Sequence, residues 1–327
     1  MDLLILVGIA ILPPVAFMLY IHHLDRIEPE PHGLIIKAMV LGAAAVIPAA
    51  LVELLLSMIP VFAAGGIVGA AIKSFIVIAP IEETVKLGVV LLFIWKNVNF
   101  NEENDGIVYT GAAAIGFALL ENIMYVLQSG FGTGIMRAVT SIPLHTFTGV
   151  LMGYFVGIAK FAPDAGKRSR TIRKGFIIAY LIHAVYDTLV LSATAAALLI
   201  IPLVIALFVF GGIYLKKGAA ISQSRWNGTA PAGDTPAPAP SATYAAAPAP
   251  RGSGTYKAVI ARILFALCTG FWALLVIGMM EGPGDAQAGI PELIAGGIIL
   301  TVIPSVVAII LEVSYRRHRK AAAGTPA

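Results

Sequence analysis

The hydrophobic pattern of the chain is a series of long apolar runs, with the polar positions gathered mainly between them. A transmembrane helix needs roughly 20 apolar residues, and the runs approach that length without the short alternation typical of an outer-membrane barrel. We therefore predict an all-α fold, a polytopic transmembrane helix bundle of about nine spans. The expected spans are 3–20, 34–59, 73–95, 107–128, 136–159, 175–193, 195–215, 259–280 and 290–312.

One polar segment divides this series. Residues 229–255 are rich in Ala and Pro and show no helical period, which is typical of a disordered, semi-extended linker. We predict three parts: a membrane-embedded core of seven spans over 1–217, a cytoplasmic linker over 218–257, and a hairpin of two spans with a basic tail over 258–327.

The composition places these runs in a membrane. Hydrophobic residues make up 58% of the chain and charged residues 12%, with a mean hydropathy of +0.89, which excludes a soluble domain of this length. Lys and Arg concentrate in 160–174, at the start of 216–257 and in 316–320, all on one side of a nine-span chain. Because such loops stay cytoplasmic, we expect a plasma-membrane protein with its N-terminus outside and its C-terminus inside. The lipid bilayer is the expected partner of this charge, and nucleic acid is not.

Ionisable residues inside the core spans are the candidates for function, because each is costly to bury in a bilayer. Lys73 and Arg137 are interpreted as anchors at the outer ends of spans, and Glu53 as a residue near another outer end. Seven further residues lie within spans: Glu82, Glu83, Lys86, Glu121, His145, His183 and Asp187.

These candidates share one depth. With spans running alternately inward and outward, a rise of about 1.5 Å per residue places Glu83, His145 and His183 roughly 15 Å below the outer surface. The same rise places Glu121 and Asp187 about 10 Å below it. Charges retained for unrelated reasons would have no cause to share a level, so we predict a single intramembrane site.

The residue types indicate the chemistry of this site. Neutral imidazoles with a carboxylate are the ligand set of a catalytic zinc, and a further carboxylate could act as general base. Glu82 and Lys86 are four residues apart and could form a pair, leaving Glu83 pointing elsewhere. The H-E-x-x-H zinc motif is absent, so spacing alone leaves the metal open. Gly149, Gly153 and Gly157 follow His145 at four-residue steps, which predicts that this face meets a neighbouring helix.

Four successive motifs resemble the PrsW-type intramembrane proteases, distant relatives of the type II CAAX prenyl endopeptidases. EETVK (82–86) is similar to E-E-x-x-K, and FALLEN (117–122) to F-x-x-x-E-N. HTFTG (145–149) and HAVYD (183–187) are similar to H-x-x-x-G and H-x-x-x-D. LDRIEPEP (24–31) resembles the acidic, proline-containing first loop of that family. The resemblance covers about residues 15–215.

The resemblance implies an intramembrane endopeptidase, described as a metalloprotease, that hydrolyses membrane-embedded substrates such as anti-sigma factors. By motif, Glu82 and Glu83 take the catalytic role, with Zn²⁺ as the expected cofactor. The expected metal ligands are Glu121, His145 and His183, and the expected supporting residues are Lys86, Asn122 and Asp187. Water activation by the Glu and His residues without metal is the alternative mechanism.

Other interpretations stay open. A proton- or ion-coupled transporter would use the same buried Glu, His and Asp residues, and Pro80 beside the glutamates is compatible with the broken helix of a transporter. A non-catalytic membrane binding protein of the same fold is the third class, and Glu82 with Lys86 could be only a structural ion pair. For the acidic loop 25–30 we predict a solvated turn, with a lid or a substrate contact as alternatives.

Overall fold

The structure is a computed structural model that describes residues 3–63 and 65–226 of the chain. Every regular element within these residues is a helix, which confirms the predicted all-α class. Of the described residues, those from Leu6 onward belong to one compact unit. The description below concerns this unit. The predicted hairpin over 258–327 lies outside the described residues.

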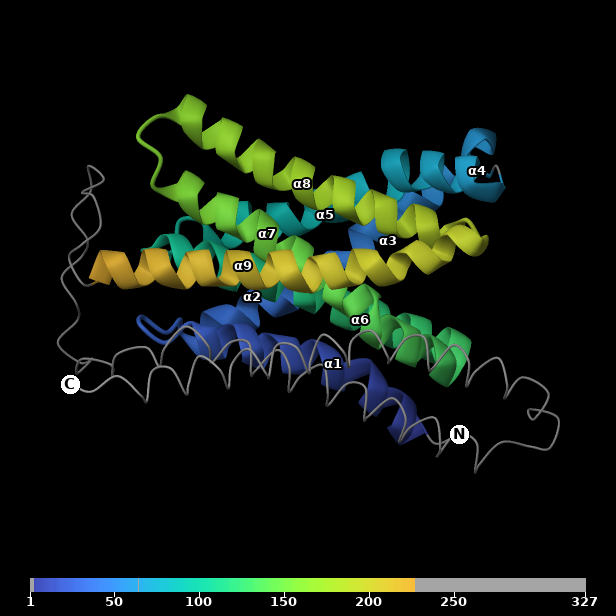
Figure 1. Ribbon diagram of the computed structural model, residues 1–327, viewed down its shortest axis with the longest axis horizontal. Coiled ribbons are helices and arrows are strands. Elements are labelled where there is room, and N and C mark those ends of the chain that lie inside the picture. Colours follow the sequence, from blue (N-terminus) through green and yellow to red (C-terminus); the bar gives the residue numbers. More distant parts are fainter. Residues whose placement is uncertain (1–2, 64, 227–327) are drawn as a thin grey trace, which may run out of the picture. The chain divides into compact units, whose positions relative to one another are not determined.

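The helices follow one another through short connections (Figure 1). They are α1 (Leu3–Leu24), α2 (His32–Ala44), α3 (Val46–Ser57), η1 (Pro60–Ala63), α4 (Gly66–Lys73), η2 (Ser74–Ile78), α5 (Ala79–Val89), η3 (Val90–Ile94), α6 (Glu103–Val139), α7 (Ser141–Lys160), α8 (Ala165–Leu191), η4 (Ala195–Leu199) and α9 (Ile200–Trp226).

Five helical runs in the described part of the chain are long and apolar enough to cross a membrane. One of them joins α6 and α7, which hold two of the predicted spans. The run from Gly66 to Ile94 contains all but the last residue of the predicted span 73–95. It is helical, alternates between α- and π-helical turns, and is charged at its centre. The membrane character of the chain is supported, and the number of nine spans stays a prediction. The five runs are Leu3–Leu24, His32–Ser57, Glu103–Lys160, Ala165–Leu191 and Ala195–Trp226.

The last described helix extends further than expected. Residues 218–226 belong to α9 and not to the predicted linker, whose remaining residues lie outside the described part. Ser222 and Trp226 of this extension both donate to the carboxylate of Glu102, just before α6. These contacts stabilise the last turns of α9.

A π-helical turn precedes the charged part of α5. Pro80 lacks a backbone N–H and its ring crowds the carbonyl one turn earlier, which disfavours regular α-helical hydrogen bonding just before it. The chain widens to a π-helix over Ser74–Ile78 (η2) and resumes as α5 at Ala79. Such turns occur often at functional sites, and this one directly precedes Glu82.

Helix α7 is the central helix of the described unit and packs against α6, α8 and α9 (Figure 1). Its glycines meet α6, because a Cβ atom at Gly153 would overlap the backbone of Gly106 and one at Gly157 the backbone of Glu103. The two helices therefore run antiparallel at a separation that only glycine permits. This confirms that the glycine face of α7 meets a neighbouring helix.

Helix α6 reverses near its end. Gly130 has φ 80° and ψ −168°, outside the helical region and accessible mainly to glycine. Beyond it, the guanidinium of Arg137 reaches the side chains of Glu121 and Asn122. A straight helix would separate positions 121 and 137 by about 24 Å, so the segment after Gly130 folds back along the segment before it.

The acidic loop between α1 and α2 is not a solvated turn, and that prediction is wrong. Asp25 and Glu30 are 3% and 2% exposed. Asp25 accepts hydrogen bonds from the backbone N–H of Glu30 and from the amide of Asn104 at the start of α6. These two carboxylates are buried because they bind the side chains of Asn104 and Tyr109 on α6 instead of water.

Candidate active site

The predicted site residues come together from four helices. Glu82, Glu83 and Lys86 lie on α5, Glu121 on α6, His145 on α7, and His183 with Asp187 on α8. The side chains of Glu83 and Lys86 have no exposed surface, and those of Glu82, His145 and His183 are buried. The shared depth estimated from the sequence therefore corresponds to a single buried cluster.

Lys86 is the hub of this cluster. Its Nζ lies 3.1 Å from Glu82 Oε2, 2.9 Å from Glu83 Oε1 and 2.9 Å from His145 Nδ1. The spacings of three and four residues put both glutamates on the lysine's side of α5. The expectation that Glu83 points away from the pair is therefore wrong. The ring of Phe117 covers the ammonium, with its centroid 4.4 Å from Nζ.

The two histidines connect the remaining carboxylates. His183 Nδ1 lies 2.7 Å from Glu83 Oε1, and its Nε2 lies 3.7 Å from Glu82 Oε2 and 3.3 Å from Asp187 Oδ2. The predicted pairing of His183 with Asp187 across one helical turn is thus present. His145 Nε2 lies 3.1 Å from Glu121 Oε2. The two imidazole rings meet edge to face at 5.0 Å.

Arg137 belongs to the cluster, although the sequence interpretation made it an outer-end anchor. Its guanidinium lies 2.8 Å from Glu121 Oε2 and 3.0 Å from Asn122 Oδ1. Asn122 also donates to the carbonyl of Ala10 on α1, so it holds three segments together. The reversal at Gly130 brings Arg137 here, and the glycine-rich stretch SGFGTG (129–134) was the available signal for it.

Glu53 of α3 is a second residue that the sequence interpretation left out of the site. It lies within electrostatic range of Glu82, Glu121 and Asp187. Its Oε1 is buried without a hydrogen-bond partner. It therefore places a further carboxyl group beside the cluster.

Three residues of the cluster fit a metal ion. Glu82, His145 and His183 each offer one ligand atom, and these atoms lie within 4.8 Å of one another. Two imidazoles and a carboxylate are a zinc donor set. The group contains Glu82, whereas the sequence interpretation expected Glu121, whose Oε2 is held here by Arg137 and His145.

The outer contacts of the histidines agree with this ligand set. His183 Nδ1 faces Glu83, and His145 Nε2 faces Glu121, so each ring has one nitrogen held by a carboxylate. Ligating histidines commonly donate their other ring N–H to such a carboxylate. The nitrogens left to face a cation are His183 Nε2 and His145 Nδ1. Asp187 Oδ2 lies 3.3 Å from His183 Nε2, so a cation bound there would take the place of that contact. Lys86 Nζ contacts that same His145 nitrogen, so a metal there would displace the ammonium.

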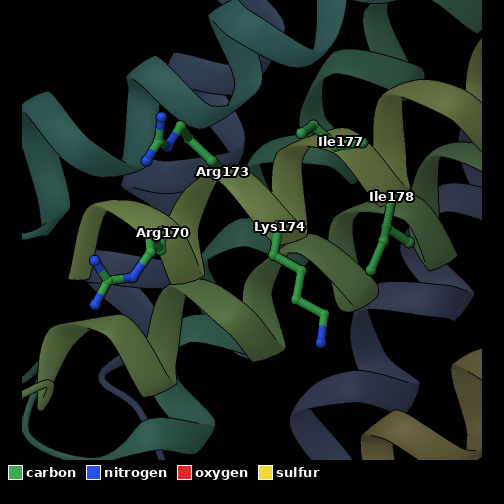
Figure 2. Close-up of a pocket in the computed structure, with 5 residues that line it drawn as sticks. All are labelled: Arg170, Arg173, Lys174, Ile177 and Ile178. Carbon is green, nitrogen blue, oxygen red and sulfur yellow. The ribbon is translucent and has the colours of Figure 1, made fainter. Parts of the chain in front are cut away.

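A hollow on α8 lies apart from the cluster in sequence. It is lined by residues from the first half of the helix, and Figure 2 shows their basic side chains extending from it in different directions. None of the site residues on α5 to α8 described above lines this hollow, so we place the candidate active site at their buried cluster. The lining residues are Arg170, Arg173, Lys174, Ile177 and Ile178.

Comparisons with known proteins point to one family. Residues 30–213 match the family described as PrsW family intramembrane metalloprotease. The chain is 36% identical to the Protease PrsW of Geobacillus kaustophilus over 188 residues, 57% of this chain and 80% of that protein. It is 34% identical to the one of Clostridioides difficile over 205 residues, 61% and 85% of the two chains. For the one of Bacillus subtilis the identity is 27% over 218 residues, 67% and 97%. No solved structure matches the chain.

Proposed function

The chain belongs to the PrsW family of intramembrane metalloproteases, and from that premise we propose that the buried cluster on α5–α8 is its catalytic centre. The protein is an intramembrane endopeptidase. The observation that carries the proposal is the convergence of Glu82, His145 and His183, with Glu83 2.7 Å from His183.

We assign the metal ligands to Glu82, His145 and His183, and the metal to zinc. The assignment is supported by the donor set and by the carboxylates that hold the outer ring nitrogens. When bound there, zinc supplies Lewis-acid polarisation of the scissile carbonyl and makes a nearby water more acidic. Glu121 then acts through His145, and Arg137 fixes Glu121.

Glu83 is the proposed general base. Its Oε1 is held by Lys86 and His183, while its Oε2 is buried without a hydrogen-bond partner. That free oxygen can accept a proton from the attacking water and return it to the amine as the C–N bond breaks. Lys86 compensates the charge of two adjacent carboxylates, and Glu83 orients His183 through Nδ1. Asp187 lies 3.3 Å from His183 Nε2, the nitrogen assigned to the metal, so its carboxylate borders the metal site.

The family and the basic loops support a proposal for the substrate class and the orientation. We propose single-span membrane proteins as substrates, anti-sigma factors among them, cleaved in a plasma membrane in which the basic 160–174 loop is cytoplasmic. A reporter inserted after Gly228 is then cytoplasmic, and one inserted at Gly284 is external. Finding both on the same side would contradict this orientation.

The experiment that tests the metal assignment compares wild type with His145→Ala and His183→Ala after purification under identical conditions. Zinc is expected at about one ion per chain in wild type and well below that in both variants, because each loses one of three ligands. Cleavage of a co-reconstituted single-span substrate is measured on the same samples and should follow the zinc content. Full cleavage by wild-type protein free of metal would contradict the assignment.

A further inference from the structure

A second group of carboxylates lies at the opposite end of α6 from the reversal at Gly130. Asp25, Glu28 and Glu30 come from the loop between α1 and α2, and Glu102 and Asp105 from the start of α6. We call these five residues the acidic cluster. Four of them are at most 3% exposed, and Glu28 is half-buried. The proposed catalytic chemistry does not use any of them.

In three members of the acidic cluster, one carboxylate oxygen accepts a hydrogen bond and the other oxygen has no hydrogen-bond donor. Glu28 Oε1 accepts from the amide of Asn101, and Glu30 Oε2 from the hydroxyl of Tyr109. Asp105 Oδ2 accepts from two backbone N–H groups, 2.7 Å from that of Asn101. The other oxygens, Oε2 of Glu28, Oε1 of Glu30 and Oδ1 of Asp105, are buried without a hydrogen-bond partner.

These three carboxylates also converge. One oxygen from each of Glu28, Glu30 and Asp105 lies within 4.8 Å of the others. The carboxyl groups of Glu30 and Asp105 are within hydrogen-bonding range of each other, although a carboxylate has only acceptors to offer. Buried acceptors that face each other need a proton or a cation between them, because burial of unpaired charge is very costly.

The surrounding contacts fix the shape of the group. Asp25 accepts from Glu30 N–H at 3.0 Å and from Asn104 at 2.8 Å, which holds the loop against α6. Glu102 accepts from Ser222 at 2.8 Å and from the indole of Trp226, which holds the end of α9. Donors of this kind orient metal-binding carboxylates before the ion arrives.

The electrostatics of the loop agree with a missing positive charge. The nearby basic residues bind elsewhere: Arg225 pairs with Glu103 at 2.6 Å, and Lys160 donates to the carbonyl of Trp95. The free carboxylate oxygens are thus available to an ion.

We propose that Glu28, Glu30 and Asp105 bind a hard divalent cation, Mg²⁺ or Ca²⁺, which fastens the α1–α2 loop to the start of α6. All the ligands are oxygens, which suits these ions and not zinc. Glu28 is the half-buried member and gives the ion its route from solvent. The role is structural, since the ion would join segments that support α6, the helix that carries Glu121.

The test measures thermal unfolding of the full chain in detergent after removal of metal by chelation. Addition of MgCl₂ or CaCl₂, against KCl of equal ionic strength, should raise the melting temperature by on the order of 5 °C at saturation. Calorimetric titration with each ion then identifies the one that binds more tightly. The series is repeated in the His145→Ala, His183→Ala double variant, so that an ion at the candidate active site cannot account for the response.

Substitutions locate the ion. The double variant Glu30→Gln, Asp105→Asn should abolish the cation-induced rise in melting temperature. Glu103→Gln is the control, because Glu103 lies next to the acidic cluster in sequence but pairs with Arg225, and this variant should keep the rise. Glu28→Gln, at the half-buried edge, serves if the double variant does not fold, and should weaken cation affinity by about tenfold or more. A wild-type protein without a response to either ion, or an undiminished response in Glu28→Gln, would overturn the proposal.

Discussion

The candidate active site and the acidic cluster both bury carboxylate side chains, but they surround them with different partners. In the active site, the carboxylates of Glu82, Glu83 and Glu121 lie against Lys86, Arg137 and two imidazoles. In the acidic cluster, the donors to Glu28, Glu30 and Asp105 are amides and a hydroxyl. The carboxylates of the active site are paired with cationic side chains, whereas those of the acidic cluster have free oxygens for the proposed metal ion.

This difference separates two kinds of site. Nitrogen and oxygen donors together suit zinc and hydrolysis, whereas oxygens alone suit a hard ion that stabilises structure. The protein's own cations also let carboxylates remain in the middle of helices, while the acidic cluster lies at a loop and at a helix start. Of the following changes, those at Lys86 and at the pair of Arg137 and Glu121 act on the candidate active site. The change at Gly153 acts on the packing that supports both regions.

The largest effect on stability is expected from Lys86→Met. This change keeps the length of the side chain but leaves Glu82 and Glu83 buried side by side without their ammonium partner. Removing one partner of a buried pair costs about 3 to 5 kcal/mol, so the apparent melting temperature should fall strongly. Lys37→Met is the matched control, because Lys37 is exposed and its Nζ lies 3.4 Å from the carbonyl of Phe93. Equal melting curves for the two variants would show that Lys86 does not hold the cluster together.

A smaller effect is expected from Gly153→Ala, which tests the contact between α6 and α7 that aligns both regions. The added methyl would overlap the backbone of Gly106, and overpacking of this kind costs about 2 kcal/mol. Gly33→Ala is the control, since a Cβ there meets nothing within 4 Å. The melting temperature should fall only for Gly153→Ala. An unchanged melting temperature would mean that the two helices are not in this close contact.

The smallest effect is expected from the pair of Arg137 and Glu121, whose side chains are 14% and 13% exposed. A double-mutant cycle with Arg137→Gln and Glu121→Gln should give a coupling of about 1 kcal/mol in unfolding. Additive effects would indicate that the reversal at Gly130 does not bring these residues together. Tyr125→Leu is a useful companion, because the guanidinium of Arg137 lies 4.2 Å from that ring.

The convergence of the site could be predicted from the sequence, because depth in a membrane follows directly from position along a helix. The rise per residue placed Glu83, His145 and His183 at one level, and the structure joins Glu83 to His183 directly. Helical spacing likewise indicated the contacts of Lys86 with Glu82 and of His183 with Asp187.

The remaining features depend on contacts that sequence spacing does not contain. Arg137 reaches Glu121 only because the chain turns at Gly130, and a single positive φ has no periodic signal. The loop at Asp25 and Glu30 looked solvated because its partners, Asn104 and Tyr109, are far along the chain. Spacing also could not show that Glu121 Oε2 lies between Arg137 and His145 Nε2, while Glu82 lies near His145 and His183.

The most direct test of the catalytic assignment compares Glu83→Gln with Glu103→Gln in cleavage of a co-reconstituted single-span substrate. The two substitutions are chemically identical. Glu83 lies in the buried cluster, whereas Glu103 is the first residue of α6 and pairs with Arg225 outside that cluster. We predict that Glu83→Gln lowers the rate by about 10² to 10⁴, as expected for loss of a general base, while melting curves show both variants folded. Glu103→Gln should cleave at the wild-type rate. Cleavage by Glu83→Gln at the wild-type rate would contradict the assignment of this cluster as the catalytic centre.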